Sequence, residues 1–355
     1  MDRVSRLLNM AGVASQDAIL IHKPSNIYYL CGYSGEGLLL LTRDISAIIT
    51  DFRYTEQAGQ QAPSFQVYEI STGKSHIQVA ADVLRQAGIQ QLYYEDDYVT
   101  VVQFATMGKA MPGMTFTPIK EKPEQLRKVK DESEIAVIRK ACGISVQAFD
   151  YILTVITEGM TEREVQLKLD FKMLELGAEG LAFSTILASG ENGSLPHAVP
   201  TGRRLQKGDL ITLDFGAKYG GYCSDMTRTI ALGQLSEEMR KVYDIVLQAQ
   251  MAAQEALMPG KVCRDIDAIA RDIITQAGYG KNFGHGLGHS VGIDIHEMPR
   301  LNQTCEEVLE PGIVITVEPG IYLPAIGGVR IENTCLVTEN GAQSLVSAPR
   351  ELIIL

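Results

Sequence analysis

The sequence predicts a small α/β domain followed by a larger α+β domain with an internal two-fold repeat. The chain has 355 residues, which is enough for two domains that each bury a core of their own. Short β-type runs alternate with helical segments up to about residue 119. Beyond that point, an order of two helices followed by strands occurs twice. A charged stretch with a proline separates the two patterns, as expected of a linker.

The first domain is expected to span residues 1–122. Its β-type runs are rich in Val, Ile, Leu and Tyr and end at turn-forming residues, whereas the segments between them have a helical period. The two histidines of this region, His22 and His76, are interpreted as ordinary surface or boundary residues. The expected strands are 18–22, 37–42, 47–50, 65–70, 92–95 and 114–119, and the expected helices are 54–62, 75–87 and 100–111.

The linker is expected at residues 123–131 and the second domain at 132–355. Helical patterns cover 132–156 and 161–176 in the first half, and 236–257 and 262–277 in the second half. Thr161 and Glu164 form a capping box, which fixes the start of one of these helices. Two copies are too few for a solenoid, so we expect one domain with a pseudo-two-fold axis, its strands inside and its helices outside.

One strand of the repeat ends in a carboxylate in both halves. The run G-D-L-I-T-L-D-F-G at 208–216 is written again 104 residues further on as G-I-V-I-T-V-E-P-G at 312–320. Asp214 and Glu318 therefore occupy equivalent places, and Pro319 ends the second strand just after the acid. Because a buried carboxylate is costly unless a positive charge meets it, the pair suggests one cation site between the halves.

Further acids follow on the next strand of each half. Residues 210–230 read as a β-hairpin. A turn centred on Tyr219 and Gly220 would place Asp214 directly opposite Asp225, whereas a turn on Gly220 and Gly221 would place the two acids diagonally on one face. In the second half, Arg330 and Glu332 share one face of a strand.

The segment between these halves carries three histidines among several glycines. His285 and His289 lie in F-G-H-G-L-G-H-S-V-G at 283–292, and His296 follows. The glycines argue against a helical zinc-binding pair and favour loop or strand backbone close to a ligand. Four carboxylates carry the charge that two divalent cations neutralise. Oxygen-rich ligation with one imidazole favours manganese, cobalt or iron, with zinc as an alternative.

Together these residues resemble the pita-bread-fold metallopeptidases, a family that includes methionine aminopeptidase, Xaa-Pro aminopeptidase and prolidase. The resemblance covers the whole chain, and the first domain looks like the creatinase-type N-terminal domain of the proline-specific members. It implies five metal ligands, namely Asp214, Asp225, His289, Glu318 and Glu332. It also implies active-site histidines at His197, His285 and His296, and substrate-carboxylate arginines at Arg300 and Arg330.

The resemblance implies a metallopeptidase that cleaves the Xaa-Pro bond at the amino terminus of short peptides through a hydroxide bridging two divalent ions (Mn, Co or Zn). Glu318 would act as both ligand and general base, and His285 and His296 would stabilise the oxyanion. His197 would border the proline pocket. Xaa-Pro dipeptidase is favoured over Xaa-Pro aminopeptidase. A non-catalytic binding protein is the alternative of a different class.

The composition of the chain indicates which kinds of partner and which cellular compartment to expect. The net charge is −11 and Lys and Arg do not cluster, so nucleic acid is not an expected partner. The six cysteines are scattered without a metal-binding spacing, as in a reducing compartment. With neither a signal peptide nor a membrane span in the sequence, we expect a cytoplasmic protein, and a homodimer. Asp51, Arg53 and Tyr54 are expected to cap the following helix or to contact a dimer partner.

Overall fold

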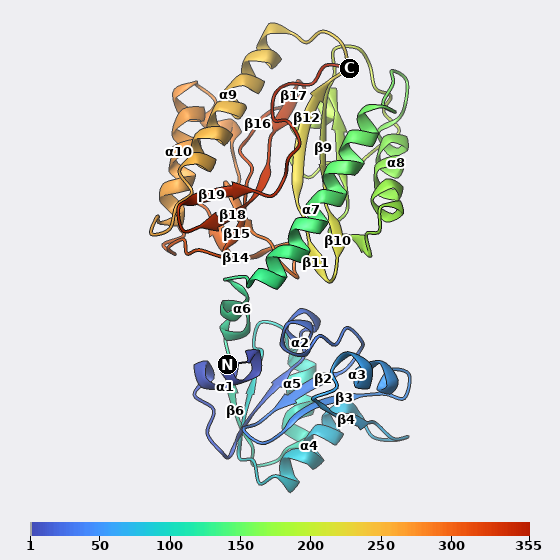
Figure 1. Ribbon diagram of the computed structural model, residues 1–355, viewed down its shortest axis with the longest axis vertical. Helices are drawn as coiled ribbons and strands as arrows, with labels where there is room; N and C mark the ends of the chain where they lie inside the picture. The colour runs from blue at the N-terminus through green and yellow to red at the C-terminus, as the bar shows by residue number, and fades with distance from the viewer. Residues whose placement is uncertain (1) are drawn as a thin grey trace. The chain divides into compact units, whose positions relative to one another are not determined.

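The structure is a computed structural model that describes residues 2–355 (Figure 1). It divides into two compact units, the first ending at Arg127 and the second spanning Lys128–Leu355. The division falls inside the stretch expected as a linker. That stretch is not all irregular, because helix α6 (Lys122–Arg127) occupies its first part. The α6 segment packs on the first unit, where the Tyr29 hydroxyl donates to the Leu126 carbonyl at 2.9 Å.

The first unit is a six-stranded sheet with helices around it. All six expected strands and all three expected helices are present. The strand order is β4-β3-β2-β1-β5-β6; β1 is parallel to β5, and β2 is antiparallel to both of its neighbours. The strands are β1 (Asp17–Ile21), β2 (Leu38–Leu41), β3 (Ser46–Thr50), β4 (Gln66–Glu69), β5 (Gln91–Tyr94) and β6 (Thr115–Pro118), and the helices among them are α3 (Thr55–Gln61), α4 (His76–Gln86) and α5 (Val101–Ala110).

Three helices were not expected from the sequence: α1 (Arg3–Ala11), α2 (Pro24–Cys31) and α6. Local signals for the first two exist in the sequence. The Asp2 side chain accepts from the Ser5 amide at the start of α1, and Pro24 stands in the first turn of α2. Of the three residues expected to cap α3, Tyr54 occupies the N-cap position but makes no side-chain cap bond. Asp51 and Arg53 pair with one another at 2.6 Å, so the expected side-chain cap is not formed.

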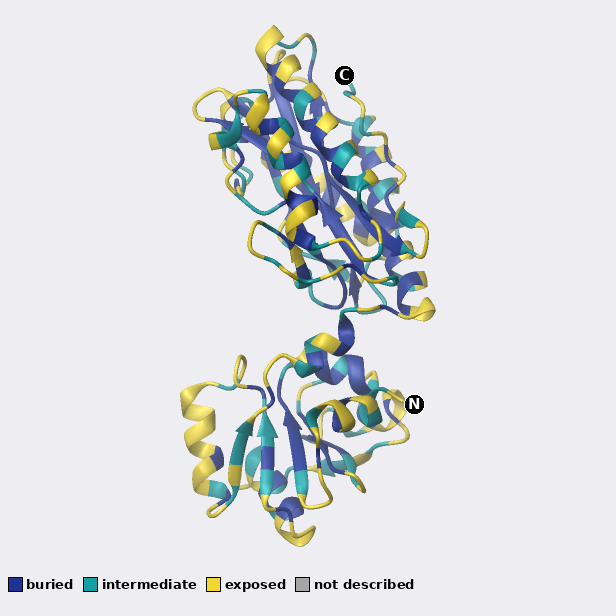
Figure 2. Ribbon diagram, turned by 90° about the vertical axis from the view of Figure 1, so that its left-hand side faces the viewer, coloured by how far each residue is buried: buried dark blue, intermediate teal, exposed yellow. Residues whose placement is uncertain are grey.

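The second unit has two helix pairs flanking its strands (Figure 1). In the first half these are α7 (Glu132–Leu153) and α8 (Glu162–Glu175), and in the second half α9 (Glu237–Glu255) and α10 (Cys263–Gln276). All four match the expected helices, and the capping box of Thr161 and Glu164 is formed. Figure 2 shows dark-blue strands inside this unit and yellow turns on the outer faces of its helices.

The strands of the second unit form several small sheets rather than one. The longest strands build two of them, with the orders β12-β9-β8 and β14-β13-β15-β18-β19. The first sheet holds β8 (Ile186–Ser189), β9 (Leu210–Phe215) and β12 (Met226–Ala231). The second holds β13 (Gly288–Ser290), β14 (Glu297–Leu301), β15 (Val314–Val317), β18 (Asn333–Thr338) and β19 (Gly341–Ser344). Shorter strands are β7 (Gly180–Leu181), β10 (Ala217–Tyr219), β11 (Tyr222–Cys223), β16 (Gly320–Leu323) and β17 (Gly327–Arg330).

The hairpin of the first half turns at Gly220 and Gly221. Both glycines have positive φ, 53° and 76°, as a two-residue turn of the primed type requires. The register pairs Asp214 with Thr227, so the alternative that placed Asp214 directly opposite Asp225 is wrong. The diagonal alternative holds.

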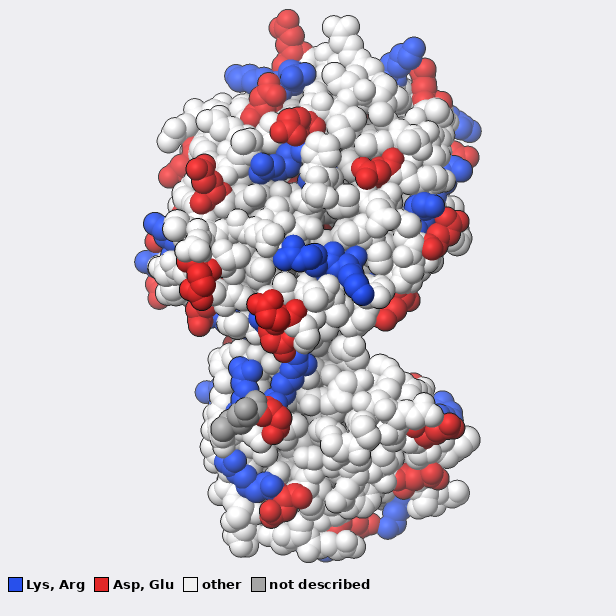
Figure 3. Space-filling model, in the orientation of Figure 1, with Lys and Arg blue, Asp and Glu red and all other residues white. Residues whose placement is uncertain are grey.

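Two features bear on nucleic acid and membranes as partners, namely the charge on the face drawn in Figure 3 and the hydropathy of the helices. On the face drawn in Figure 3, basic and acidic side chains are interspersed and do not form a field of one sign. None of the helices within residues 2–355 is long and apolar enough to cross a membrane.

Candidate active site

Two acids of the first half reach the site from the hairpin of β9 and β12. Asp214 is near the end of β9, and Asp225 lies in the break between β11 and β12. Both are buried although they are carboxylates. The hairpin register keeps their side chains on one face, so two negative charges are held together in the interior.

The second half brings two more acids to the same place. In the ladder of β15 and β18, Val317 pairs with Asn333, so the next residues outward, Glu318 and Glu332, face one another just beyond the ladder. The backbone amide of Glu332 donates to the carbonyl of Thr227 at 3.1 Å, and the Thr227 hydroxyl donates to a Glu332 carboxylate oxygen at 2.7 Å. These bonds join the two halves at the site.

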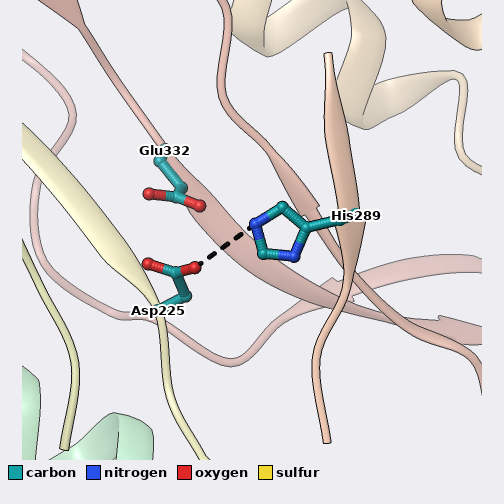
Figure 4. A group of neighbouring side chains, drawn as sticks. All are labelled: Asp225, His289 and Glu332. Carbon is teal, nitrogen blue, oxygen red and sulfur yellow. Dashed lines mark ion pairs between the residues drawn. The ribbon is translucent and has the colours of Figure 1, made fainter. Parts of the chain in front are cut away.

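His289 comes from β13, which approaches β15 closely. A Cβ at Gly288 would lie 2.1 Å from the Thr316 carbonyl oxygen, so only glycine fits before this histidine. Figure 4 shows the imidazole pointing at Asp225 and Glu332, which directly precede β12 and β18. Candidate ligand atoms of Asp225, His289 and Glu332 all lie within 4.8 Å of one another.

The hydrogen bonds of His289 fix its tautomer. Its Nδ1 lies 3.1 Å from the Ser290 carbonyl oxygen, which can only accept, so Nδ1 carries the proton. The lone pair of Nε2 then faces oxygens of Asp225 at 3.5 Å and Glu318 at 3.4 Å. Burial lowers the pKa of His289 to about 4, so the ring is neutral at pH 7. A lone pair that faces carboxylates is the arrangement of a metal ligand with its outer hydrogen bond in place.

The carboxylates show how strongly the cluster lacks positive charge. Burial, with a contribution from Glu332, raises the pKa of Asp225 well above its usual value. Burial raises the pKa of Glu318 to about 8, and burial together with Glu318 raises that of Glu332 strongly. One buried oxygen each of Asp214 and Glu332 has no hydrogen-bond partner. Divalent cations would satisfy these oxygens and restore the ordinary ionisation of the acids, so the residues fit a metal centre.

One positive side chain is already built into the site. Arg330 hydrogen-bonds to one of the four carboxylates: its Nη2 donates to Asp214 at 2.5 Å. Its Nη1 donates to the Tyr322 hydroxyl at 2.8 Å, which in turn lies 2.9 Å from His285 Nε2. Arg330 was predicted to bind a substrate carboxylate. In the structure its guanidinium is held by protein groups, whereas its charge offsets one of the four acids.

The cluster opens into a cavity of about 860 Å³ in the second unit. His197, His296 and Arg300 line it and are exposed, and the ring centroids of His296 and His289 are 4.4 Å apart. His285 also lines it, with Nδ1 hydrogen-bonded to the Gly286 carbonyl. All ten site residues predicted from the sequence therefore lie on one cavity: His197, Asp214, Asp225, His285, His289, His296, Arg300, Glu318, Arg330 and Glu332.

Sequence reasoning missed a buried acid that holds one wall of this cavity. Glu162, at the start of α8, accepts hydrogen bonds from Ser189, Asn192 and Thr201, at 2.6 to 3.2 Å. Burial alone would raise its pKa, but these hydrogen bonds outweigh burial and lower the pKa. Glu162 thus holds both ends of the segment 189–201, which carries His197. No local sequence signal pointed to this role, because Glu162 looks like an ordinary acid in the first turn of a capped helix.

Comparisons with known proteins agree with this geometry. Residues 136–339 match metallopeptidase family M24, and residues 3–129 match the creatinase/prolidase N-terminal domain. An Xaa-Pro dipeptidase of Pyrococcus furiosus is 40% identical over 99% of both chains. A solved Xaa-Pro dipeptidase of Bacillus anthracis has a TM-score of 0.95 and 40% identity, covering 99% of both chains. An X-Pro aminopeptidase of Thermotoga maritima has a TM-score of 0.92 and 36% identity, covering 100% of both.

Proposed function

The chain belongs to metallopeptidase family M24, with a creatinase/prolidase domain in front, and on this premise we propose that it hydrolyses the Xaa-Pro bond at the amino terminus of short peptides. The observation that carries the proposal is the cluster of three buried carboxylates, the half-buried Glu318 and the Nε2 of His289 on a substrate-sized cavity. Similarity to both Xaa-Pro dipeptidases and an X-Pro aminopeptidase supports the proline specificity.

Two divalent ions are the proposed cofactor, manganese being the first choice, with cobalt and zinc as alternatives. Asp214, Asp225, His289, Glu318 and Glu332 would hold them, and the ions would activate a water molecule and polarise the scissile carbonyl. The four acids and Arg330 together carry a net charge of −3. Two divalent ions bring it to +1, which leaves room for one further negative charge.

The protein's own groups supply the rest of the chemistry. Glu318 is placed to take a proton from the attacking water and return it to the leaving proline nitrogen. His296, exposed on the cavity beside His289, is the proposed donor to the oxyanion. His285 directs its Nδ1–H at the Gly286 carbonyl, so its Nε2 accepts from the Tyr322 hydroxyl, and a donor role for His285 would require a proton on Nε2. His197 is proposed to border the proline ring.

Arg300 is the residue that leads us to favour a dipeptide over a longer peptide as the substrate. It is an exposed guanidinium on the cavity wall, paired in register with His289 on the neighbouring strand, and it can bind the carboxylate of a dipeptide. Arg330 remains a second candidate for this role, although four protein groups already use its N–H donors. An Xaa-Pro aminopeptidase is the second candidate function, because the cavity volume also admits a longer peptide.

A reconstitution assay tests these proposals. Metal-stripped protein is loaded with Mn²⁺, Co²⁺ or Zn²⁺ and offered an Xaa-Pro dipeptide, an Xaa-Pro-Yaa tripeptide and a Met-Ala peptide. Faster cleavage of the dipeptide supports the dipeptidase and Arg300. Preference for the tripeptide makes the protein an aminopeptidase. Tight metal binding without cleavage of any of the three peptides would leave the non-catalytic alternative.

We also propose a cytoplasmic homodimer. All six cysteines are free thiols, as suits a reducing compartment. Leu167, Phe171 and Leu174 form an exposed apolar stripe along α8, with Phe171 62% exposed, which is a surface that a second copy of the chain would cover. Light scattering of the wild type and of Phe171→Glu tests the dimer: a monomeric wild type would refute it, and a dimeric variant would exclude this stripe as the interface.

A further inference from the structure

The first unit contains a second cavity lined by histidines. Its volume is about 250 Å³. The chain has six histidines; four of them line the active-site cavity, and the remaining two, His22 and His76, both line this one. From the sequence, both are interpreted as ordinary surface or boundary residues; in the structure His22 is buried and His76 is half-buried, and both face one cavity. The other lining residues are Gly37, Leu38, Ser75, Ile77, Gln103 and Thr106.

The cavity lies where α/β sheets commonly bind ligands. His22 directly follows β1, and β1 is parallel to β5. From β1 the chain runs to one side through β2, β3 and β4, and then crosses to the other side for β5 and β6. The strand order therefore reverses between β1 and β5, and His22 stands at the carboxyl end of β1 at this reversal. Ligand sites of open α/β sheets form outside the carboxyl ends of the strands at such a point.

The two imidazoles lack partners in the interior. His22 is 7% exposed, and apart from a contact with the Leu20 backbone that opposes the fall in its pKa, neither of its ring nitrogens has a hydrogen-bond partner; Nε2 of His76 is likewise buried without one. Buried polar groups are almost always hydrogen-bonded, so three such nitrogens on one small cavity indicate that the cavity holds a ligand or water. Burial lowers the pKa of His22 to about 4, which leaves its ring neutral with a free lone pair at pH 7.

The surroundings favour a cation over an anion. Among the described residues that line the cavity there is no lysine or arginine. The carboxylate of Glu95, at the end of β5, lies 2.6 Å from the backbone nitrogen of His22. The amino terminus of α4 opposes a cation, an effect that falls off within the first turn of the helix.

We propose that this cavity is a second metal site, at which the imidazoles of His22 and His76 bind one divalent transition-metal ion of the Zn²⁺ or Ni²⁺ class. Neutral imidazole nitrogens are preferred ligands of these ions. Water molecules in the cavity would complete the coordination. The site belongs to the first unit and is independent of the proposed peptidase activity.

Nickel counting on the full-length protein tests the proposal. Metal-stripped wild type, His22→Gln and His76→Gln are equilibrated with Ni²⁺, desalted, and analysed by mass spectrometry of the metal and by peptide hydrolysis. We expect each variant to hold one Ni²⁺ fewer per chain than the wild type, with an unchanged rate of hydrolysis. His76 is half-buried at the first position of α4, so His76→Gln keeps the fold and guards against an effect of misfolding by His22→Gln.

The Ni²⁺ difference is read independently of the active site. If the active-site assignment failed, the wild type would still bind one ion that the variants lose. Copper provides a second readout, since the electron paramagnetic resonance spectrum of Cu²⁺ at this site should show coupling to two imidazole nitrogens and lose it in either variant. Equal Ni²⁺ counts in all three proteins would overturn the proposal and leave a water-filled cavity.

Discussion

The two halves of the second unit contain equivalent strands, β9 and β15, whose threonine side chains make different contacts. Thr212 in β9 and Thr316 in β15 are equivalent by the 104-residue repeat. The Thr212 hydroxyl lies 3.1 Å from that of Thr229, within the sheet. The Thr316 hydroxyl instead donates to Glu318 at 3.2 Å and accepts from the amide of His289 at 3.0 Å. Duplication supplied a scaffold, and the second copy acquired the contacts that orient an active site.

The acids of the two strands differ in how their charge is met. Asp214 has a resident cation, because Arg330 of the second half bonds to it. Glu318 faces a threonine and a neutral histidine, and burial raises its pKa to about 8. The first acid therefore has a cationic partner within the protein, whereas no lysine or arginine among residues 2–355 is hydrogen-bonded to the second. Of these two acids, Glu318 is therefore the one that depends more on a bound metal ion.

Helix starts at equivalent places differ as well. Thr161 and Val262 precede α8 and α10 and make corresponding bridges, to Arg204 and Val308. Thr161 caps its helix with a side-chain bond and is followed by Glu162, which ties down the His197 segment. Val262 makes no such cap and is followed by the buried thiol of Cys263.

The largest expected effect comes from removing the resident cation. Arg330→Met leaves Asp214 buried without its partner, which should cost about 3–5 kcal/mol of unfolding free energy in metal-free protein at pH 7. Urea unfolding followed by circular dichroism measures it. Arg330→Lys, which keeps the charge, should lose less. A loss below about 1 kcal/mol for the methionine variant would show that Asp214 does not depend on Arg330.

The pH dependence of metal-free protein should reveal the unbalanced acid. Because the pKa of Glu318 rises from its ordinary 4.5 to about 8 on folding, the folded state keeps a proton that the unfolded state releases between these values. Stability should therefore fall as pH rises from about 4.5 to 8, by on the order of 4 kcal/mol. Glu318→Gln should flatten this slope. Glu255→Gln, an exposed acid of α9, is the control, and an equal slope in all three proteins would contradict the account.

Glu162→Gln probes the segment that the first half holds in place. An amide nitrogen cannot accept the hydrogen bonds that Ser189 and Thr201 donate, so His197 should shift, and kcat/KM for an Xaa-Pro dipeptide should fall by up to about 100-fold. Cys263→Ser, at the equivalent place of the second half, should change it little. Equal losses in the two variants would mean that general destabilisation, and not the position of His197, is measured.

Exchanging the helix caps should have the smallest effect. Val262→Thr offers α10 the side-chain cap that α8 has, and should add about 1 kcal/mol, or ~2–4 °C in Tm. The reverse change in the first half, Thr161→Val, should remove a similar amount. Calorimetry of both variants checks the symmetry. A destabilised Val262→Thr would show that the bridge to Val308 prevents the capping geometry.

The elements, and the residues that come together at the candidate site, could be predicted because their signals are local or repeated. A capping box marked the start of α8, runs of Val, Ile, Leu and Tyr marked the strands of the first unit, and the duplicated run placed Asp214 and Glu318 at equivalent strand ends. The choice of hairpin turn was not decided by pattern alone, since both alternatives put the acids on one face. The φ values of Gly220 and Gly221 decide it.

Long-range partnerships could not be predicted. Arg330 and Asp214 are 116 residues apart, and Glu162 and Thr201 are 39 apart, so each pair meets through packing that no sequence window contains. His22 and His76 are separated by strands and helices of the first unit, and each is unremarkable by itself. The same reason explains why the charge count from sequence omitted the arginine that offsets one acid.

Anomalous X-ray scattering from crystals of Mn²⁺-loaded protein tests the central claim most directly. The account predicts a manganese peak within bonding distance of Asp225, His289 and Glu332, and a second peak that shares Glu318 and draws Asp214 toward it. A crystal of hydrolytically active protein that shows no peak at these residues would contradict it.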